Sequence, residues 1–127
     1  MALNTLEIQQ FAPTTQTKAN INKFCDFLTT HPGAKIKFFA SDMLLQVHSD
    51  ASFMNEIKTR SIAAGIFFLG NKINPNMPIY LNGPIHVLCK VLDKIAASAA
   101  ETELGSLFLN VQETIKFKIA LEKLGHP

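Results

Sequence analysis

The segment from Ile62 to Leu69 is apolar on both faces that a β-strand would present, and this constrains the fold more than any other stretch. Side chains along a strand alternate between two faces. Here one face would carry Ile62, Ala64, Ile66 and Phe68, and the other Ala63, Gly65, Phe67 and Leu69. A strand that is apolar on both sides has to be covered on both sides. We therefore predict that this segment lies in the centre of a sheet.

Two further segments have the pattern of strands on either side of it. Met43 to Ser49 places Leu45, Val47 and Ser49 on one face, and Leu44, Gln46, His48 and then Asp50 on the other. Pro84 to Val91 has apolar residues at alternate positions, beginning with Ile85. Between these strands, Phe53 to Arg60 is polar enough for a connecting loop, and Gly70 to Gly83 is a long loop rich in Asn, Pro and Gly.

A helix is predicted before the strands and another after them. Thr14 or Thr15 can cap a helix that runs to about Thr30. Ser98 can cap a longer helix that runs to about Leu124 and covers the sheet. The apolar residues of this second helix lie close to one stripe, formed by Leu104, Leu107, Phe108, Val111, Ile115 and Ile119.

Lys35 to Phe39 alternates well enough for a short extra strand, which could fold back on Met43 to Val47 as a hairpin. The phenylalanines are assigned to the core and not to a base-stacking platform; the residues concerned are Phe38, Phe39, Phe67, Phe68 and Phe108. Taken together, these elements predict an α/β fold with three strands, a possible short extra strand and two helices.

Length and composition narrow the functional classes. A chain of 127 residues that is 47% hydrophobic is long enough for one core. Its formal net charge of +2 is too small to indicate nucleic-acid binding by itself. Cys25 and Cys89 suit free thiols in a reducing compartment. Because Met1 to Gln10 does not have the form of a signal peptide and no apolar window could cross a bilayer, we expect an intracellular, cytoplasmic protein.

Two carboxylates are the candidates for chemistry. Asp50 closes a strand, and Glu103 lies near the start of the long helix. Taken alone, Asp50 would be an ordinary strand-end acid, and Glu103 an acid favoured by the helix dipole. Glu101, three residues after Ser98, fits a capping role better. His48 is expected to be a packed or hydrogen-bonded histidine, since the histidines show no metal-binding spacing.

Four segments, taken in order along the chain, resemble motifs of a known protein family. Leu45–Ser52 ends a strand in Asp, and Lys58–Leu69 joins a basic residue and Ser to a glycine-containing apolar strand. Ser98–Leu104 opens the long helix with two acids, and Leu121–His126 closes it with Leu-x-x-Leu-Gly. In this order, from about Thr17 to Pro127, the chain resembles the ribonuclease H region of copia-type LTR retrotransposon polyproteins.

The resemblance implies a ribonuclease H-like α/β fold, with a three-stranded antiparallel sheet covered by the long helix, and a place in a reverse transcriptase polyprotein. Residues 1–34 would be a leader and connecting helix, and residues 35–127 an incomplete ribonuclease H-like domain. Such enzymes cleave the RNA strand of RNA–DNA hybrids with two divalent ions, usually Mg²⁺ and alternatively Mn²⁺. By this resemblance Asp50 would bridge both ions, and Glu103 would be the ligand from the helix.

The same resemblance suggests contacts to the hybrid. Ser52 and Asn55 lie near the site and could touch ribose hydroxyls. Arg60 is the candidate for a phosphate contact. The lysines of the long helix are expected to form an ordinary solvated face.

The chain departs from the family after the long helix, because the family's third carboxylate follows on a later strand and this chain stops at Pro127. We therefore expect weak binding of one ion at Asp50 and Glu103, and no nuclease activity from this chain alone. The strand that ends at Asp50 would become an open edge, which favours a homodimer or aggregation. The alternative is a non-catalytic interaction module that self-associates through this edge, and a gene fragment without function is a third reading. Partners implied by the family are an RNA–DNA hybrid and the reverse transcriptase region of the same polyprotein, in a virus-like particle if the parent element is active.

Overall fold

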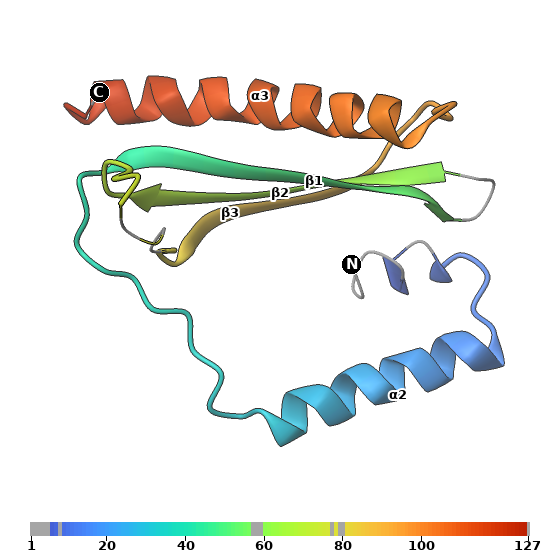
Figure 1. Cartoon of the computed structure of the whole chain (residues 1–127). Helices are drawn as coiled ribbons and strands as arrows, with labels where there is room; N and C mark the ends of the chain where they lie inside the picture. Colours follow the sequence, from blue (N-terminus) through green and yellow to red (C-terminus); the bar gives the residue numbers. More distant parts are fainter. Residues whose placement is uncertain (1–5, 8, 57–59, 77, 79–80, 127) are drawn as a thin grey trace. The chain divides into compact units, whose positions relative to one another are not determined.

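The computed structural model describes residues 6–7, 9–56, 60–76, 78 and 81–126, without the side chains of residues 55 and 56. The chain divides into two compact units, Met1–Lys35 and Ile36–Pro127. Each unit is described by itself. Within the described residues, the main elements follow in the order helix α2, strands β1, β2 and β3, and helix α3 (Figure 1).

The first unit contains helix α2 (Thr15–Thr30), which begins with a capping box. The Thr14 hydroxyl accepts a hydrogen bond from the Thr17 amide at 3.2 Å, and the Thr17 hydroxyl accepts one from the Thr14 amide at 3.0 Å. Two amides that would otherwise lack helical partners are satisfied in this way. The helix ends at His31, ahead of Pro32 and Gly33. The prediction of this helix is confirmed.

The second unit contains a three-stranded antiparallel sheet in the order β1-β2-β3, formed by β1 (Leu44–Glu56), β2 (Arg60–Gly70) and β3 (Pro84–Val91). β2 is the central strand, as predicted (Figure 1). Its buried apolar side chains are Ile62, Ala63, Phe67 and Phe68. Ile66 is exposed, so the face that β2 turns away from the long helix is only partly covered.

β1 is longer than the sequence indicates. The prediction of a loop from Phe53 to Arg60 is wrong for residues 53–56 and for Arg60, which lie in β1 and β2. The register shifts between Ser52 and Glu56, and Met54 has a φ of 52°. The Met54 amide donates to the Ser61 hydroxyl at 3.1 Å. A β-bulge or similar irregularity can extend a strand through residues that do not alternate between apolar and polar side chains, as in residues 53–56.

The predicted extra strand from Lys35 to Phe39 is absent from the described residues, where residues 36–42 are irregular. The backbone groups of Phe39 form hydrogen bonds with the side chain of Asn82 instead of with a neighbouring strand. The Asn82 side chain accepts from the Phe39 amide at 2.9 Å and donates to the carbonyl oxygens of Phe39, at 2.9 Å, and Leu69, at 2.8 Å. Phe38 and Phe39 are exposed, so their assignment to the core is wrong.

Helix α3 (Ala99–Lys123) lies along one face of the sheet and contacts β1 and β2 (Figure 1). Its predicted bounds are confirmed, with Ser98 as the N-cap. The buried face differs from the one expected. The buried residues of α3 are Thr102, Ser106 and Asn110, which contact the sheet, and Leu121 near its end, whereas the predicted apolar stripe is exposed and Phe108 lies outside the core.

Candidate functional site

A polar seam joins α3 to the sheet; it consists of the buried residues Ser61, Thr102, Ser106 and Asn110 and of the exposed Ser49 at its rim. The Thr102 hydroxyl donates to the Ser61 hydroxyl at 3.3 Å. The Ser106 hydroxyl donates to the carbonyl oxygen of Asp50. These contacts satisfy polar groups that would otherwise be costly to bury, and they hold the first turns of α3 against β1.

Asn110 packs directly against β1 and β2. Its Nδ2 lies 2.9 Å from the Ser49 hydroxyl oxygen and 2.9 Å from the Ala64 carbonyl oxygen. A Cβ at Gly65 would lie 1.7 Å from Asn110 Oδ1, so only glycine leaves room for this side chain. Among the described residues, Asn110 Oδ1 has no hydrogen-bond partner. The packing of α3 on β2 at this point therefore requires both Asn110 on the helix and Gly65 on the strand.

The sequence contains a pattern that could have predicted this seam. Thr102, Ser106 and Asn110 are spaced four residues apart, and Gly65 interrupts the apolar strand opposite them. A helix face of small polar residues opposite a glycine allows the backbone of the helix to lie close to the backbone of the strand. Reading amphipathicity alone assigns that face to solvent, which is why the seam was missed.

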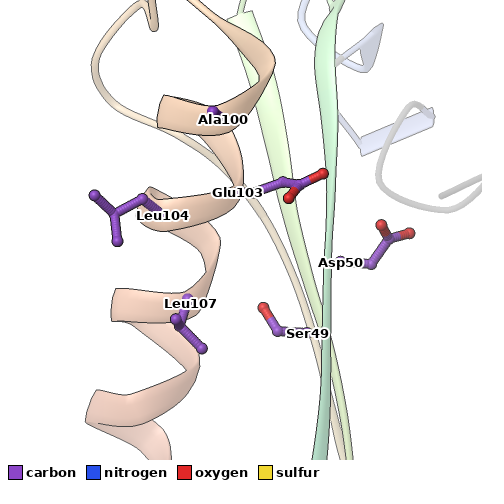
Figure 2. A pocket seen from close by; sticks show the side chains of 6 residues that line it. All are labelled: Ser49, Asp50, Ala100, Glu103, Leu104 and Leu107. Carbon is purple, nitrogen blue, oxygen red and sulfur yellow. The ribbon is translucent and has the colours of Figure 1, made fainter.

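A pocket of about 460 Å³ lies beside the seam and contains both predicted metal ligands. Its lining residues are Ser49, Asp50, Ala100, Glu103, Leu104 and Leu107 (Figure 2). The Glu103 side chain extends from α3 toward β1 (Figure 2). Two acids far apart in the sequence therefore reach one pocket, because α3 crosses beside β1.

The two carboxylates approach β1 from different sides. Ser49 faces α3, since its hydroxyl contacts Asn110. Asp50 is the next residue in a regularly paired stretch of β1, so its side chain points to the opposite face of the strand. Figure 2 shows the Asp50 carboxylate turned away from α3. The backbone of Asp50 belongs to the seam through Ser106, and its side chain is exposed.

The donor set of this pocket does not fit a two-ion centre. The described residues contain no group of three or more His, Cys, Asp or Glu side chains that could hold a metal ion. Two carboxylates cannot neutralise two divalent cations, and the Ser49 hydroxyl is already engaged in the seam. Carboxylates such as those of Asp50 and Glu103 suit a hydrated hard cation, but in this structure the two side chains lie on different sides of β1 and do not form one pair of ligands.

The predicted contacts to nucleic acid are spread along β1 and β2. Ser52 is buried two residues beyond Asp50. Arg60 is exposed at the start of β2, where it pairs with Glu56 in the ladder. The side chain of Asn55 lies outside the described residues. Of the three, Arg60 presents a charge on the surface of the second unit.

Two neighbouring polar residues have structural roles. The His48 ring packs against Phe68, with ring centroids 5.3 Å apart, as expected for a packed histidine. Glu101 accepts a hydrogen bond from the Ala97 amide at 2.7 Å and donates its own amide to Ser98 at 3.1 Å. Glu101 is therefore a capping residue at the start of α3.

Comparison of the chain with protein-family models, with curated proteins and with solved structures finds no match. Within the part of the chain that the structure describes, neither helix is long and apolar enough to cross a membrane. Cys25 and Cys89 are free thiols. A proposal about function therefore depends on the pocket and on the packing around it.

Proposed function

We propose that the second unit is related to ribonuclease H, and that its ancestral activity was hydrolysis of the RNA strand of RNA–DNA hybrids. The observation that supports this most is the pocket that Asp50 and Glu103 line together. Further support comes from the order of the elements, since three antiparallel strands precede a long helix that carries the second acid. The acid pair and the order of the elements are what the resemblance to copia-type ribonuclease H regions implies.

The proposed role of Asp50 and Glu103 in this chain is limited to weak binding of one Mg²⁺ or Mn²⁺ ion. A bound ion would supply positive charge next to a phosphate. Because Asp50 points to the face of β1 away from α3, rotation of its side chain alone would not bring its carboxylate to Glu103; a shared ion would require a change in the β1 backbone at Asp50. We expect the chain alone to cleave no hybrid, since two acids leave the second ion of a two-ion mechanism without ligands.

Contact with a hybrid would be weak and sensitive to salt. Arg60 is an exposed cation at the start of β2, the strand that pairs with the β1 segment holding Asp50 and Ser52. A formal net charge of +2 gives little long-range attraction to a polyanion. The reverse transcriptase region of the same polyprotein is the proposed source of additional contacts.

A metal titration of the full chain tests this proposal. Mn²⁺ binding followed by electron paramagnetic resonance is expected to show one weak site, with a Kd on the order of 10⁻³ M. Asp50→Asn and Glu103→Gln should each weaken it by tenfold or more, because each removes one of two anionic ligands. Glu122→Gln, an exposed acid near the other end of α3, is the matched control and should have no effect.

A fluorescently labelled RNA–DNA hybrid, incubated with the wild-type chain and Mg²⁺ or Mn²⁺, is expected to stay intact. If Asp50→Asn and Glu103→Gln bind Mn²⁺ as tightly as the wild type, the assigned pocket is wrong. Metal-dependent cleavage by the wild type would contradict the expected inactivity and would support the nuclease relationship.

A second candidate function is that of a non-catalytic module that self-associates through β1. The observation that favours it is the position of β1 at one side of the sheet, as a strand of 13 residues. Long outer strands offer backbone groups to a strand from another chain. Hydrogen exchange should then show amides of residues 44–52 becoming better protected as the protein concentration rises through the micromolar range. Protection that is independent of concentration would rule this mode out.

A further inference from the structure

The apolar side chains of α3 form an exposed stripe, which we call the α3 stripe; it comprises Leu104, Leu107, Phe108, Val111, Ile115 and Ile119. Their exposed fractions range from 48% to 66%. Successive helical residues are about 100° apart, so this stripe lies on the side of α3 opposite to Thr102, Ser106 and Asn110. The seam and the stripe therefore occupy two opposite faces of one helix.

The area of the α3 stripe is large for a surface that stays in water. Six half-exposed apolar side chains present on the order of 100 Å² each, or roughly 600 Å² together. That is near the upper limit for the largest apolar patch of a typical monomer. Two such stripes facing each other would bury about 1,200 Å², which reaches the lower range of stable protein interfaces.

The spacing within the stripe suits a second helix. Leu104, Phe108, Val111 and Ile115 are separated by four, three and four residues. This alternation keeps one seam of apolar side chains facing a partner helix, as in a coiled coil. The stripe is therefore matched to a helix that carries the same alternation, such as α3 of a second copy.

The charges of α3 select the direction of such a pairing. The first turns carry the acids Glu101 and Glu103, and the later turns carry the exposed lysines Lys116 and Lys118. In an antiparallel pair with Leu104 opposite Ile115 of the second copy, Glu101 lies opposite Lys118, and two-fold symmetry repeats this contact. A parallel pair would place like charges opposite each other, which is unfavourable.

The lysines have partners within α3 that do not prevent this arrangement. Lys116 donates to Glu113 at 2.7 Å and lowers the pKa of that carboxyl, chiefly through this hydrogen bond. Lys118 lies 3.7 Å from Glu122. Exposed ion pairs of this kind contribute little to stability, so Lys118 can also face Glu101 of another copy.

We propose that two copies of this chain dock through their α3 stripes as an antiparallel, two-fold symmetric helix pair. Two-fold symmetry makes each contact occur twice. The contacts at the centre are Phe108 against Val111, flanked by Leu104 against Ile115. The pairing does not use β1, so it is independent of the strand-edge mode.

Sedimentation of the full chain with a matched pair of variants tests the proposal. The wild type is expected to be a dimer at micromolar concentration. Val111→Glu should weaken dimerisation at least 100-fold, because two-fold symmetry would place a buried carboxylate against Phe108 of the other copy twice. Val87→Glu is the control, since Val87 is a valine of similar exposure (58% against 48%) on β3, paired with Ile66 on the sheet face away from α3. Val87→Glu should dimerise like the wild type.

A monomeric wild type overturns the proposal, including the case in which another segment of the same chain covers the stripe. Unchanged dimerisation of Val111→Glu overturns it too, and would point to the β1 edge. Circular dichroism of both variants should match that of the wild type. If Val111→Glu is unfolded, the cross-linking experiment that follows decides.

Disulfide cross-linking tests the direction of the helices. In a Cys25→Ser, Cys89→Ser background, copies with Leu104→Cys are mixed with copies that carry Ile115→Cys and oxidised mildly. Antiparallel pairing predicts efficient cross-links between positions 104 and 115, and at least tenfold fewer between two thiols at position 104. Equal or more cross-linking of position 104 with itself, or no cross-link at all, contradicts the proposed pair.

Discussion

Asn110 occupies the space that a side chain at position 65 would fill, and this single contact sets how closely α3 approaches the sheet. Nδ2 of Asn110 bonds to both β1 and β2, through Ser49 and Ala64. The Oδ1 atom, without a hydrogen-bond partner in the described residues, lies over the glycine Cα, where a weak C–H···O contact can offset part of its desolvation.

Gly65→Ala is expected to destabilise the second unit by about 1–3 kcal/mol, because the added methyl group would overlap Asn110 and displace α3. Gly33→Ala is the control, since a Cβ at that position meets no atom within 4 Å. Urea denaturation measures both. The double variant Gly65→Ala, Asn110→Ala should lose less stability than the sum of the single changes. Strict additivity would show that the two residues do not interact.

At the scale of elements, the helices begin where local side chains cap them and end where the chain cannot continue. Ser98 accepts from the Glu101 amide at 3.1 Å, and Thr102 returns a hydrogen bond to the Ser98 carbonyl at 3.1 Å. These contacts lie within one turn, so they depend little on the rest of the molecule. They also orient the turn that carries Glu103 into the pocket.

Ser98→Ala is expected to cost about 1 kcal/mol of stability through the lost cap. Ser98→Asp should keep most of the stability, since its carboxylate can accept the same hydrogen bond and favours the positive end of the helix dipole. Thermal unfolding of the three proteins measures the difference. Equal losses for both substitutions would mean that the Ser98 hydroxyl does not cap α3.

At the scale of the whole molecule, the second unit presents two surfaces that favour association, the outer strand β1 and the α3 stripe. They lie on different elements, so a chain that used both would assemble beyond a dimer. A dimer formed through α3 leaves the outer edge of β1 free to pair with another strand. A dimer formed only through β1 leaves the α3 stripe exposed to water. The matched variants at positions 111 and 87 separate these modes.

The strands and helices of this protein follow from local pattern. Capping residues at Thr14 and Ser98, and the apolar segment Ile62 to Leu69, predicted both helices and the central strand, because these signals act over a few neighbouring residues. Asp50 and Glu103 both line one pocket, but the Asp50 carboxylate points to the face of β1 away from Glu103, so the predicted pair of metal ligands stays a prediction. The relationship to ribonuclease H stays a proposal.

Tertiary structure alone decided which face of α3 is buried, how far β1 extends and where residues 36–42 run. Polarity predicted that the stripe around Val111 would cover the sheet, but β2 offers a glycine opposite Asn110, and a close-packed polar face fits there. Likewise, Asn82 holds the backbone of Phe39 and prevents a hairpin with β1. Periodicity within an element determines that it forms; the shape and hydrogen-bonding groups of the surface across from it determine how it packs.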